Sequence, residues 1–101
     1  MRLIVFFDLP VETTEERRAY TKFRRYLIQS GYMMMQESVY CKMVLNASSQ
    51  AQAIDRLRYN RPEKGLVQVL SITEKQYSKI EFIAGEFATD IINSDERLII
   101  L

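Results

Sequence analysis

The chain begins with an apolar run that ends in a carboxylate and a proline, Leu3-Ile4-Val5-Phe6-Phe7-Asp8-Leu9-Pro10. Residues 2–7 show no polar alternation and include β-branched and aromatic side chains, which predicts a central strand buried on both faces. Pro10 fixes its own backbone and restricts that of Leu9, so the strand should break into a loop here. The carboxylate of Asp8 therefore stands at the mouth of a predicted buried strand.

A basic amphipathic helix is predicted to follow. Thr13 or Thr14 begins it, Glu15 and Glu16 complement its dipole in the first turn, and Gly31 is a natural end. The predicted inward face is centred on Phe23 and includes Ala19, Tyr20, Tyr26, Leu27 and Ser30. The cations fall to the side of this face or opposite it: Arg17, Arg18, Lys22, Arg24 and Arg25.

The middle of the chain predicts two strands, a helix and a third strand. Residues 32–35 and 38–45 are extended stretches, and either a hairpin or one long strand with a bulge fits them. A weaker helix should run from a cap at residues 46–48 to about Tyr59, with Ala47, Ala51, Ile54 and Leu57 inward. A turn at 62–65, a strand at 66–72 and a short helical piece from Thr73 to about Ile80 complete the pattern.

The order strand–helix–strand–strand–helix–strand predicts an α+β fold of the ferredoxin-like split βαβ type (βαββαβ). In this fold both helices cover one face of an antiparallel sheet. With 101 residues, of which 48% are hydrophobic, the chain should form a single domain over residues 1–101. The other face of the sheet must then be solvated or meet a partner.

Residues 81–101 form a tail that ends in an apolar strand, Arg97-Leu98-Ile99-Ile100-Leu101. A free apolar strand is an aggregation hazard, so this one should add to a sheet edge in its own subunit or in a neighbour's. Together with the run Met33-Met34-Met35, the tail favours a two-fold homodimer packed through the sheets. Alternatively, the methionines fill the core beneath the helices.

The net charge of +1 hides an uneven distribution. The segment from Arg17 to Lys64 contains ten Lys or Arg and three acids, a net charge of +7. The segment from Glu74 to Glu96 contains two lysines and six acids, a net charge of −4. This asymmetry indicates a basic working surface, although solvated helices charged at random would also produce it. The chain has no histidine, so the commonest general base and transition-metal ligand are absent.

The sequence argues against a membrane-spanning protein, an exported protein and one held by an internal disulfide. It has no apolar run of the roughly 18 residues that a membrane span requires. Its first residues are too short an apolar segment for a signal peptide. The lone Cys41 cannot form an internal disulfide and is expected to be a small packed side chain. A cytoplasmic protein without a membrane partner is therefore expected.

Asp8 is a candidate metal ligand. Mg²⁺ prefers carboxylate oxygens and keeps several waters, so it needs few protein ligands. An isologous dimer could bring two copies of Asp8 across its axis, and a metal between them would polarise a phosphate and lower the pKa of a bound water. An aspartate before Leu9-Pro10 is also typical of an ordinary turn or capping residue.

The basic helix is a candidate reader of phosphates, because arginine forks match phosphate geometry. The candidates for nucleic-acid binding are Arg17, Arg18, Lys22, Arg24, Arg25 and Lys42, and the patch could extend to Arg56, Arg58, Arg61 and Lys64. No motif typical of base reading is present, which favours recognition of the backbone and of shape.

Taken together, these segments resemble the Cas2 family of CRISPR-associated proteins, most closely its type II form. The segments that carry the resemblance are Phe7-Asp8-Leu9-Pro10, Glu16-Arg17-Arg18-x-Tyr20-x-Lys22-Phe23-Arg24, Gly31-Tyr32, Gln36-x-Ser38-Val39-Tyr40, Thr73-Glu74-Lys75-Gln76 and Ser94-x-Glu96-Arg97-Leu98. Each segment is unspecific alone, but their joint order is specific and covers essentially the whole chain.

The resemblance implies a homodimer in which the terminal strand joins the partner's sheet. It implies that this dimer bridges two dimers of the Cas1 integrase and holds a short foreign DNA duplex for spacer acquisition. The family is also described as a Mg²⁺-dependent endonuclease acting on RNA or DNA. Asp8 matches its metal-binding and catalytic aspartate, with one shared ion per dimer. For some members cutting is dispensable, so a scaffold without catalysis remains open, as does a ferredoxin-like regulatory or protein-interaction module without a nucleic-acid role.

Overall fold

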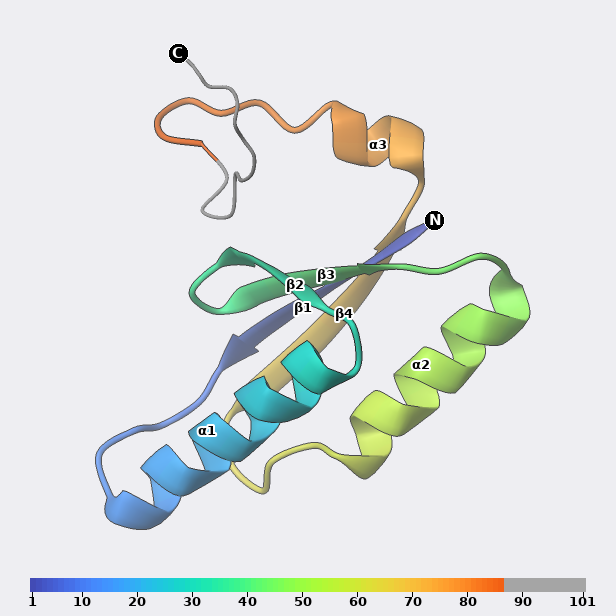
Figure 1. Cartoon of the computed structure of the whole chain (residues 1–101). Helices are drawn as coiled ribbons and strands as arrows, with labels where there is room; N and C mark the ends of the chain where they lie inside the picture. The colour runs from blue at the N-terminus through green and yellow to red at the C-terminus, as the bar shows by residue number, and fades with distance from the viewer. Residues whose placement is uncertain (87–101) are drawn as a thin grey trace.

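Strand β1 (Arg2–Asp8) lies inside a four-stranded antiparallel sheet, between β3 (Val39–Met43) and β4 (Leu66–Ile72), and β2 (Met33–Gln36) forms the edge beyond β3. The computed structural model describes residues 1–86. Helices α1 (Thr14–Gln29) and α2 (Ala47–Tyr59) cover one side of this sheet, as Figure 1 shows. The order β2-β3-β1-β4 is that of the ferredoxin-like fold, which confirms the predicted fold class.

The two faces of the sheet differ because strand side chains alternate. On the helix side, Leu3, Val5 and Phe7 of β1 are at most 5% exposed and belong to the core. Around them pack Phe23 and Leu27 of α1, Tyr32 and Tyr40 of the β2–β3 region, and Leu57 of α2. We call the opposite side the open face.

Helix α1 begins where the sequence predicts. Thr13 is the N-cap: its hydroxyl accepts a hydrogen bond from the backbone N–H of Glu16, and the Glu16 carboxylate accepts one from the backbone N–H of Thr13. The helix ends before Gly31, whose φ of +92° is the left-handed conformation that glycine adopts readily. Phe23 is at the centre of the buried face as predicted, but Ala19 is exposed.

The segment after α1 forms a hairpin, the first of the two predicted alternatives, rather than one long strand. The pairing of its strands shifts register between Met34 and Gln36. Helix α2 spans the predicted residues with Asn46 as its N-cap. Its inward face was predicted in part wrongly, because Ala47 and Ala51 are exposed whereas Ala53 is buried with Leu57.

A third helix, α3 (Glu74–Ser78), partly covers the open face. The guanidinium of Arg2 joins it to the sheet: Nε donates to Glu74 Oε1 at 3.0 Å, and Cζ lies 3.9 Å from the centroid of the Tyr77 ring. Beneath this contact, Ile4 and Cys41 are buried, as expected for Cys41. The prediction that β1 is buried on both faces is wrong at Phe6, which is 37% exposed because it lies on the open face.

The predicted terminal strand, 97–101, lies outside the described residues. Met34 packs against the core, as the second interpretation of the methionines predicted, whereas Met33 is 57% exposed on the open face. The dimer contact stays a prediction. Within residues 1–86, no helix combines the length and apolar character that crossing a lipid bilayer requires.

Candidate nucleic-acid interface and metal ligand

The cations of α1 form two exposed rows. Arg18, Lys22 and Arg25 follow one another at helical spacing and lie opposite the buried face of Phe23 and Leu27. Arg17 and Arg24 lie one row further round, and all five side chains are exposed. We call Arg18, Lys22 and Arg25 the α1 ridge.

Members of the α1 ridge have no hydrogen bond or ion pair with any other side chain among residues 1–86, and the same holds for Arg24. Positive charge without a partner on one helix row is what a polyanion can neutralise. Other cations are already engaged: Arg58 Nη1 lies 2.9 Å from Asp55 Oδ1, and Lys64 Nζ lies 3.7 Å from Glu16 Oε2.

Arg17 has a different role from its neighbours. Its Nη1 donates to the backbone carbonyls of Val11 at 3.2 Å and Glu12 at 2.9 Å, and Nη2 donates to the hydroxyl of Thr14 at 3.3 Å. The side chain therefore ties the loop after β1 to the first turn of α1. No feature of the local sequence distinguished it from Arg18.

Lys42 of β3 is separate from the α1 ridge in the sequence but also lies on the helix side of the sheet, since it pairs with Leu3. Its Nζ is 5.4 Å from the centroid of the Tyr32 ring, a cation–π contact. Burial raises the pKa of Tyr32 to about 12, so this tyrosine is a neutral neighbour. Lys42 thus keeps an uncompensated charge.

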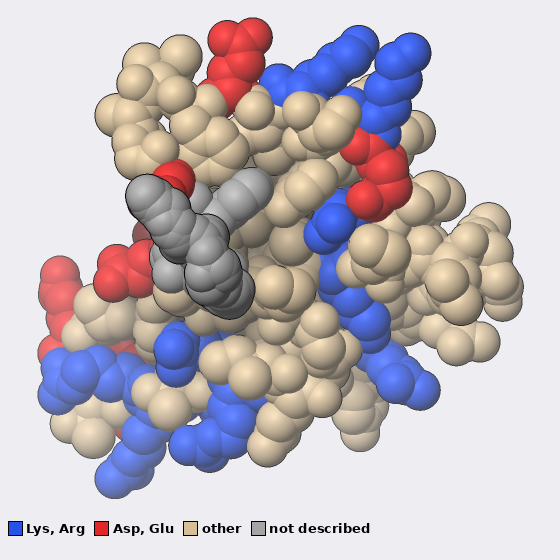
Figure 2. All heavy atoms as spheres, turned by 45° about the horizontal axis from the view of Figure 1, so that its top comes forward, with Lys and Arg blue, Asp and Glu red and all other residues tan. Residues whose placement is uncertain are grey.

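On one face of the molecule, Lys and Arg side chains lie in groups with Asp and Glu side chains beside them (Figure 2). Figure 2 shows one face on which Lys and Arg side chains form two groups, one at the lower left and one that runs down the right-hand side. In the sequence, ten of the 14 Lys and Arg residues lie between Arg17 and Lys64.

Asp8 ends β1 on the open face, where it pairs with Leu66 at the start of β4. Its side chain is exposed and has no hydrogen-bond or ion-pair partner among the residues that the structure describes. Over the same residues no group of three or more His, Cys, Asp or Glu could hold a metal ion. Residues 1–86 of one protomer therefore do not complete a metal site at Asp8, and Mg²⁺ would need further oxygens from a second copy or from the substrate.

Gly65, immediately before β4, supports the position of Asp8. Its φ is +94°, and a Cβ at this position would lie 2.7 Å from the backbone oxygen of Asp8. The sequence marked this glycine only as part of a turn, because a close approach between residues so far apart in the chain leaves no local signal.

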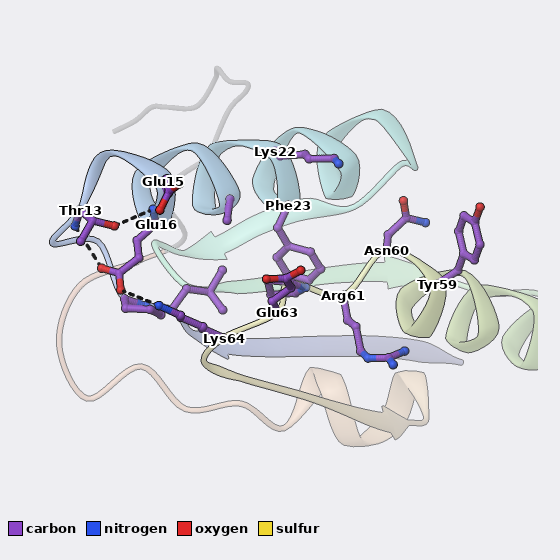
Figure 3. Close-up of a pocket in the computed structure, with 14 residues that line it drawn as sticks. Thr13, Glu15, Glu16, Lys22, Phe23, Tyr59, Asn60, Arg61, Glu63 and Lys64 are labelled. Atoms are coloured by element: carbon purple, nitrogen blue, oxygen red, sulfur yellow. Dashed lines mark hydrogen bonds and ion pairs between the residues drawn. The ribbon is translucent and has the colours of Figure 1, made fainter.

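A pocket of about 620 Å³ lies on the helix side, between the start of α1 and the end of α2, and Asp8 does not line it. Figure 3 shows Thr13 and Lys64 pointing toward Glu16 from two sides. Hydrogen bonds from the backbone N–H of Thr13 and of Glu12, together with Lys64, hold the pKa of Glu16 below its ordinary value. Among the described residues, as many acids as cations line this pocket, so it has no net positive charge to attract an anion. Lys22 of the α1 ridge also lines it but forms no ion pair with its acids.

Comparison with known proteins identifies the family. The family profile described as "CRISPR associated protein Cas2" matches residues 1–80. The chain is 54% identical over 101 residues, all of both chains, to a protein of Treponema denticola named "CRISPR-associated endoribonuclease Cas2". It is 48% identical to a protein of the same name from Streptococcus mutans, over 100% of this chain and 93% of the relative.

Among solved structures, the fold resembles a Cas2 from Streptococcus pyogenes in its crystal structure at pH 6.5. The TM-score is 0.64 at 18% sequence identity, and the match covers 83% of this chain and 100% of the other. This likeness concerns the fold alone. With a family profile over residues 1–80 and relatives that match along their whole length, the chain belongs to the Cas2 family of CRISPR-associated proteins.

Proposed function

We propose that this protein acts in CRISPR adaptation as a homodimer that bridges two dimers of the Cas1 integrase and holds the incoming DNA duplex for spacer integration. The α1 ridge is the observation that carries the proposal. Three exposed cations without partners in one row match the phosphate backbone of a duplex, and no base-reading motif accompanies them.

The open face supports the homodimer. Among its side chains, Phe6, Met33, Met43, Leu66 and Leu70 are between 37% and 57% exposed. An apolar patch of this kind on a soluble domain marks a contact surface. Among the described strands, β4 pairs only with β1, so one of its edges is open to a further strand. The tail strand 97–101 of the partner is the proposed occupant of that edge.

A second candidate function is a Mg²⁺-dependent endonuclease that cuts RNA or DNA, as the word "endoribonuclease" in the names of the relatives suggests. Asp8 would hold the ion together with Asp8 of the partner subunit, one ion per dimer. When bound, Mg²⁺ would polarise the phosphodiester and activate a water. The exposed, unpaired carboxylate of Asp8 favours this role, because it is free to bind a cation.

An integration assay tests the lead proposal. Purified protein, a Cas1 integrase from the same organism, a short duplex and a plasmid carrying repeats should together give integrated spacers. The variant Arg18→Ala/Lys22→Ala/Arg25→Ala should lose integration, because the duplex is no longer held. Asp8→Asn should retain it, because the scaffold does not need the metal. Unchanged integration by the triple variant would contradict the proposal.

The competing class is a regulatory or protein-interaction module of the cytoplasm with no nucleic-acid role. Such a module would not bind a duplex at physiological salt, whereas a protein that holds DNA with the α1 ridge would bind one. A gel-shift titration separates the two.

A further inference from the structure

A second pocket, of about 250 Å³, lies on the helix side between β3 and α2. Its polar lining consists of Lys42 from the strand and Ser49, Gln52 and Arg56 from the helix, with Met43 and Leu45 among the apolar residues beside them. Among residues 1–86 no carboxylate lines it, whereas three line the pocket at the start of α1. The pocket is therefore positively charged and carries neutral hydrogen-bond donors.

Arg56 has no ion pair among the described residues, and its guanidinium makes no hydrogen bond there. Arg58, two positions along the same helix, is bound to Asp55 at 2.9 Å and does not line the pocket. Arg58 is thus paired with a carboxylate of its own helix, whereas the guanidinium of Arg56 can bind a ligand. Since α2 places residues two apart on different sides, only Arg56 lies on the side toward Lys42.

The ammonium of Lys42 has an aromatic neighbour: its Nζ lies 5.4 Å from the centroid of the Tyr32 ring, a cation–π contact. The ring is buried and its hydroxyl stays neutral, so it orients the ammonium without neutralising it. A cation that is already oriented loses less conformational entropy on binding an anion.

We infer that this pocket binds one phosphate group, with Lys42 and Arg56 as the charges and the Ser49 hydroxyl and Gln52 amide as additional donors. The chemistry fits, because guanidinium and ammonium groups form short charge-assisted hydrogen bonds to phosphate oxygens. Where the phosphate belongs to a nucleic-acid backbone, the inference rests on the proposed function and adds a fixed contact on β3 and α2 to the exposed row on α1. Such a contact sets the position of a duplex along the protein.

Binding of inorganic phosphate tests the pocket without any nucleic acid. In a ¹⁵N-labelled sample, phosphate should shift the amide resonances of Ser49 and Gln52 in a saturable way. Lys42→Met, which removes the charge but keeps a long unbranched side chain, and Arg56→Ala should each weaken the response, whereas Arg58→Ala should leave it unchanged. Equal shifts in all three variants, or no shift in the wild type, would overturn the inference.

Measuring duplex binding then distinguishes a phosphate of a nucleic-acid backbone from that of a free phosphate-bearing molecule. Loss of one phosphate contact reduces the slope of log K against log salt by about 0.9, which is roughly an eightfold loss of affinity at 0.1 M salt. We expect this loss for Arg56→Ala and not for Arg58→Ala, which removes the same charge. If both variants bind the duplex equally while inorganic phosphate still shifts Ser49 and Gln52, the pocket takes a free phosphate-bearing molecule. If the wild type binds no duplex, the proposed function fails and the phosphate titration alone decides this inference.

Discussion

A Cβ atom on Gly65 would lie 2.7 Å from the backbone oxygen of Asp8 and 3.0 Å from Cα of Leu9. The first residue of β4, Leu66, pairs with Asp8, so the chain before β4 passes directly against the end of β1. Only a glycine permits this approach at a φ of +94°. The position of the proposed metal ligand therefore depends on a residue 57 positions later in the chain.

The first prediction concerns Gly65→Ala, with Gly31→Ala as its control. Both glycines have similar positive φ values, but a Cβ on Gly31 would meet nothing closer than 3.9 Å. Both variants should lose about 1 kcal/mol from backbone strain. Gly65→Ala should lose roughly 1–3 kcal/mol more, because the added carbon clashes with backbone. Urea unfolding measures the difference, and equal losses would show that the close approach is unimportant.

The second prediction concerns the metal. Asp8→Asn keeps the shape of the side chain but removes its charge, so Mg²⁺-dependent cleavage of RNA or DNA should fall by about 100-fold or more. Asp55→Asn, which alters an aspartate paired with Arg58 on α2, should cut like the wild type. Cleavage by Asp8→Asn at the wild-type rate would assign the activity to another group or to a contaminant.

The third prediction concerns the open face. Leu70 pairs with Ile4 and is 51% exposed, so Leu70→Asp should place a charge inside the proposed dimer contact and shift the protein from dimer to monomer. Tyr59→Asp alters a side chain that is 90% exposed at the end of α2, and it should leave the dimer intact. Sedimentation velocity distinguishes the species. A wild-type monomer at micromolar concentration would remove the basis for a shared metal site.

The fourth prediction concerns the start of α1. Hydrogen bonds from Thr13 and Glu12 and the charge of Lys64 lower the pKa of Glu16 from its ordinary value of 4.5. The stabilisation is fully present above that ordinary value and is lost as the pH falls through the lowered one. Glu16→Gln should therefore be less stable than wild type at pH 7, and the gap should close in acid.

Glu15→Gln is the control for this pH dependence, because Glu15 precedes Glu16 in the same turn and its side chain forms no hydrogen bond or ion pair among residues 1–86. Its stability should follow the wild-type pH profile. Parallel profiles for all three proteins between pH 7 and pH 2 would mean that the cap does not depend on the charge of Glu16.

The sequence predicted the elements well because their signals are local. The proline after β1, the cap at Thr13 and the glycine after α1 each define a boundary by backbone chemistry within a few residues. The inward face of α2 was harder. Alanine is small enough to occur on either side of a helix, so Ala47 and Ala51 gave a false signal and Ala53 was overlooked.

For the site, composition identified the basic helix but not the state of each cation. Whether an arginine is engaged depends on carbonyls and carboxylates that folding brings near, as the contrast between Arg17 and Arg18 shows. The contact of Arg2 with Glu74 joins residues 72 positions apart, and the spacing of hydrophobic residues along the chain could not have predicted it. The place of Asp8 at the end of β1 was predictable because a polar residue that ends an apolar strand is visible in the sequence itself, and its role as a metal ligand stays a prediction.

The central claim is that the unpaired cations of the α1 ridge grip a nucleic-acid backbone. The most direct measurement is the salt dependence of duplex binding by wild type, by Arg18→Ala/Lys22→Ala/Arg25→Ala, and by a triple variant of equal charge in which the engaged cations Arg58, Arg61 and Lys64 become alanine. In the ridge variant, the slope of log K against log salt should become shallower by about 0.9 for each phosphate contact removed. The slope of the control variant should stay close to that of the wild type. The same slope for both triple variants would contradict the account.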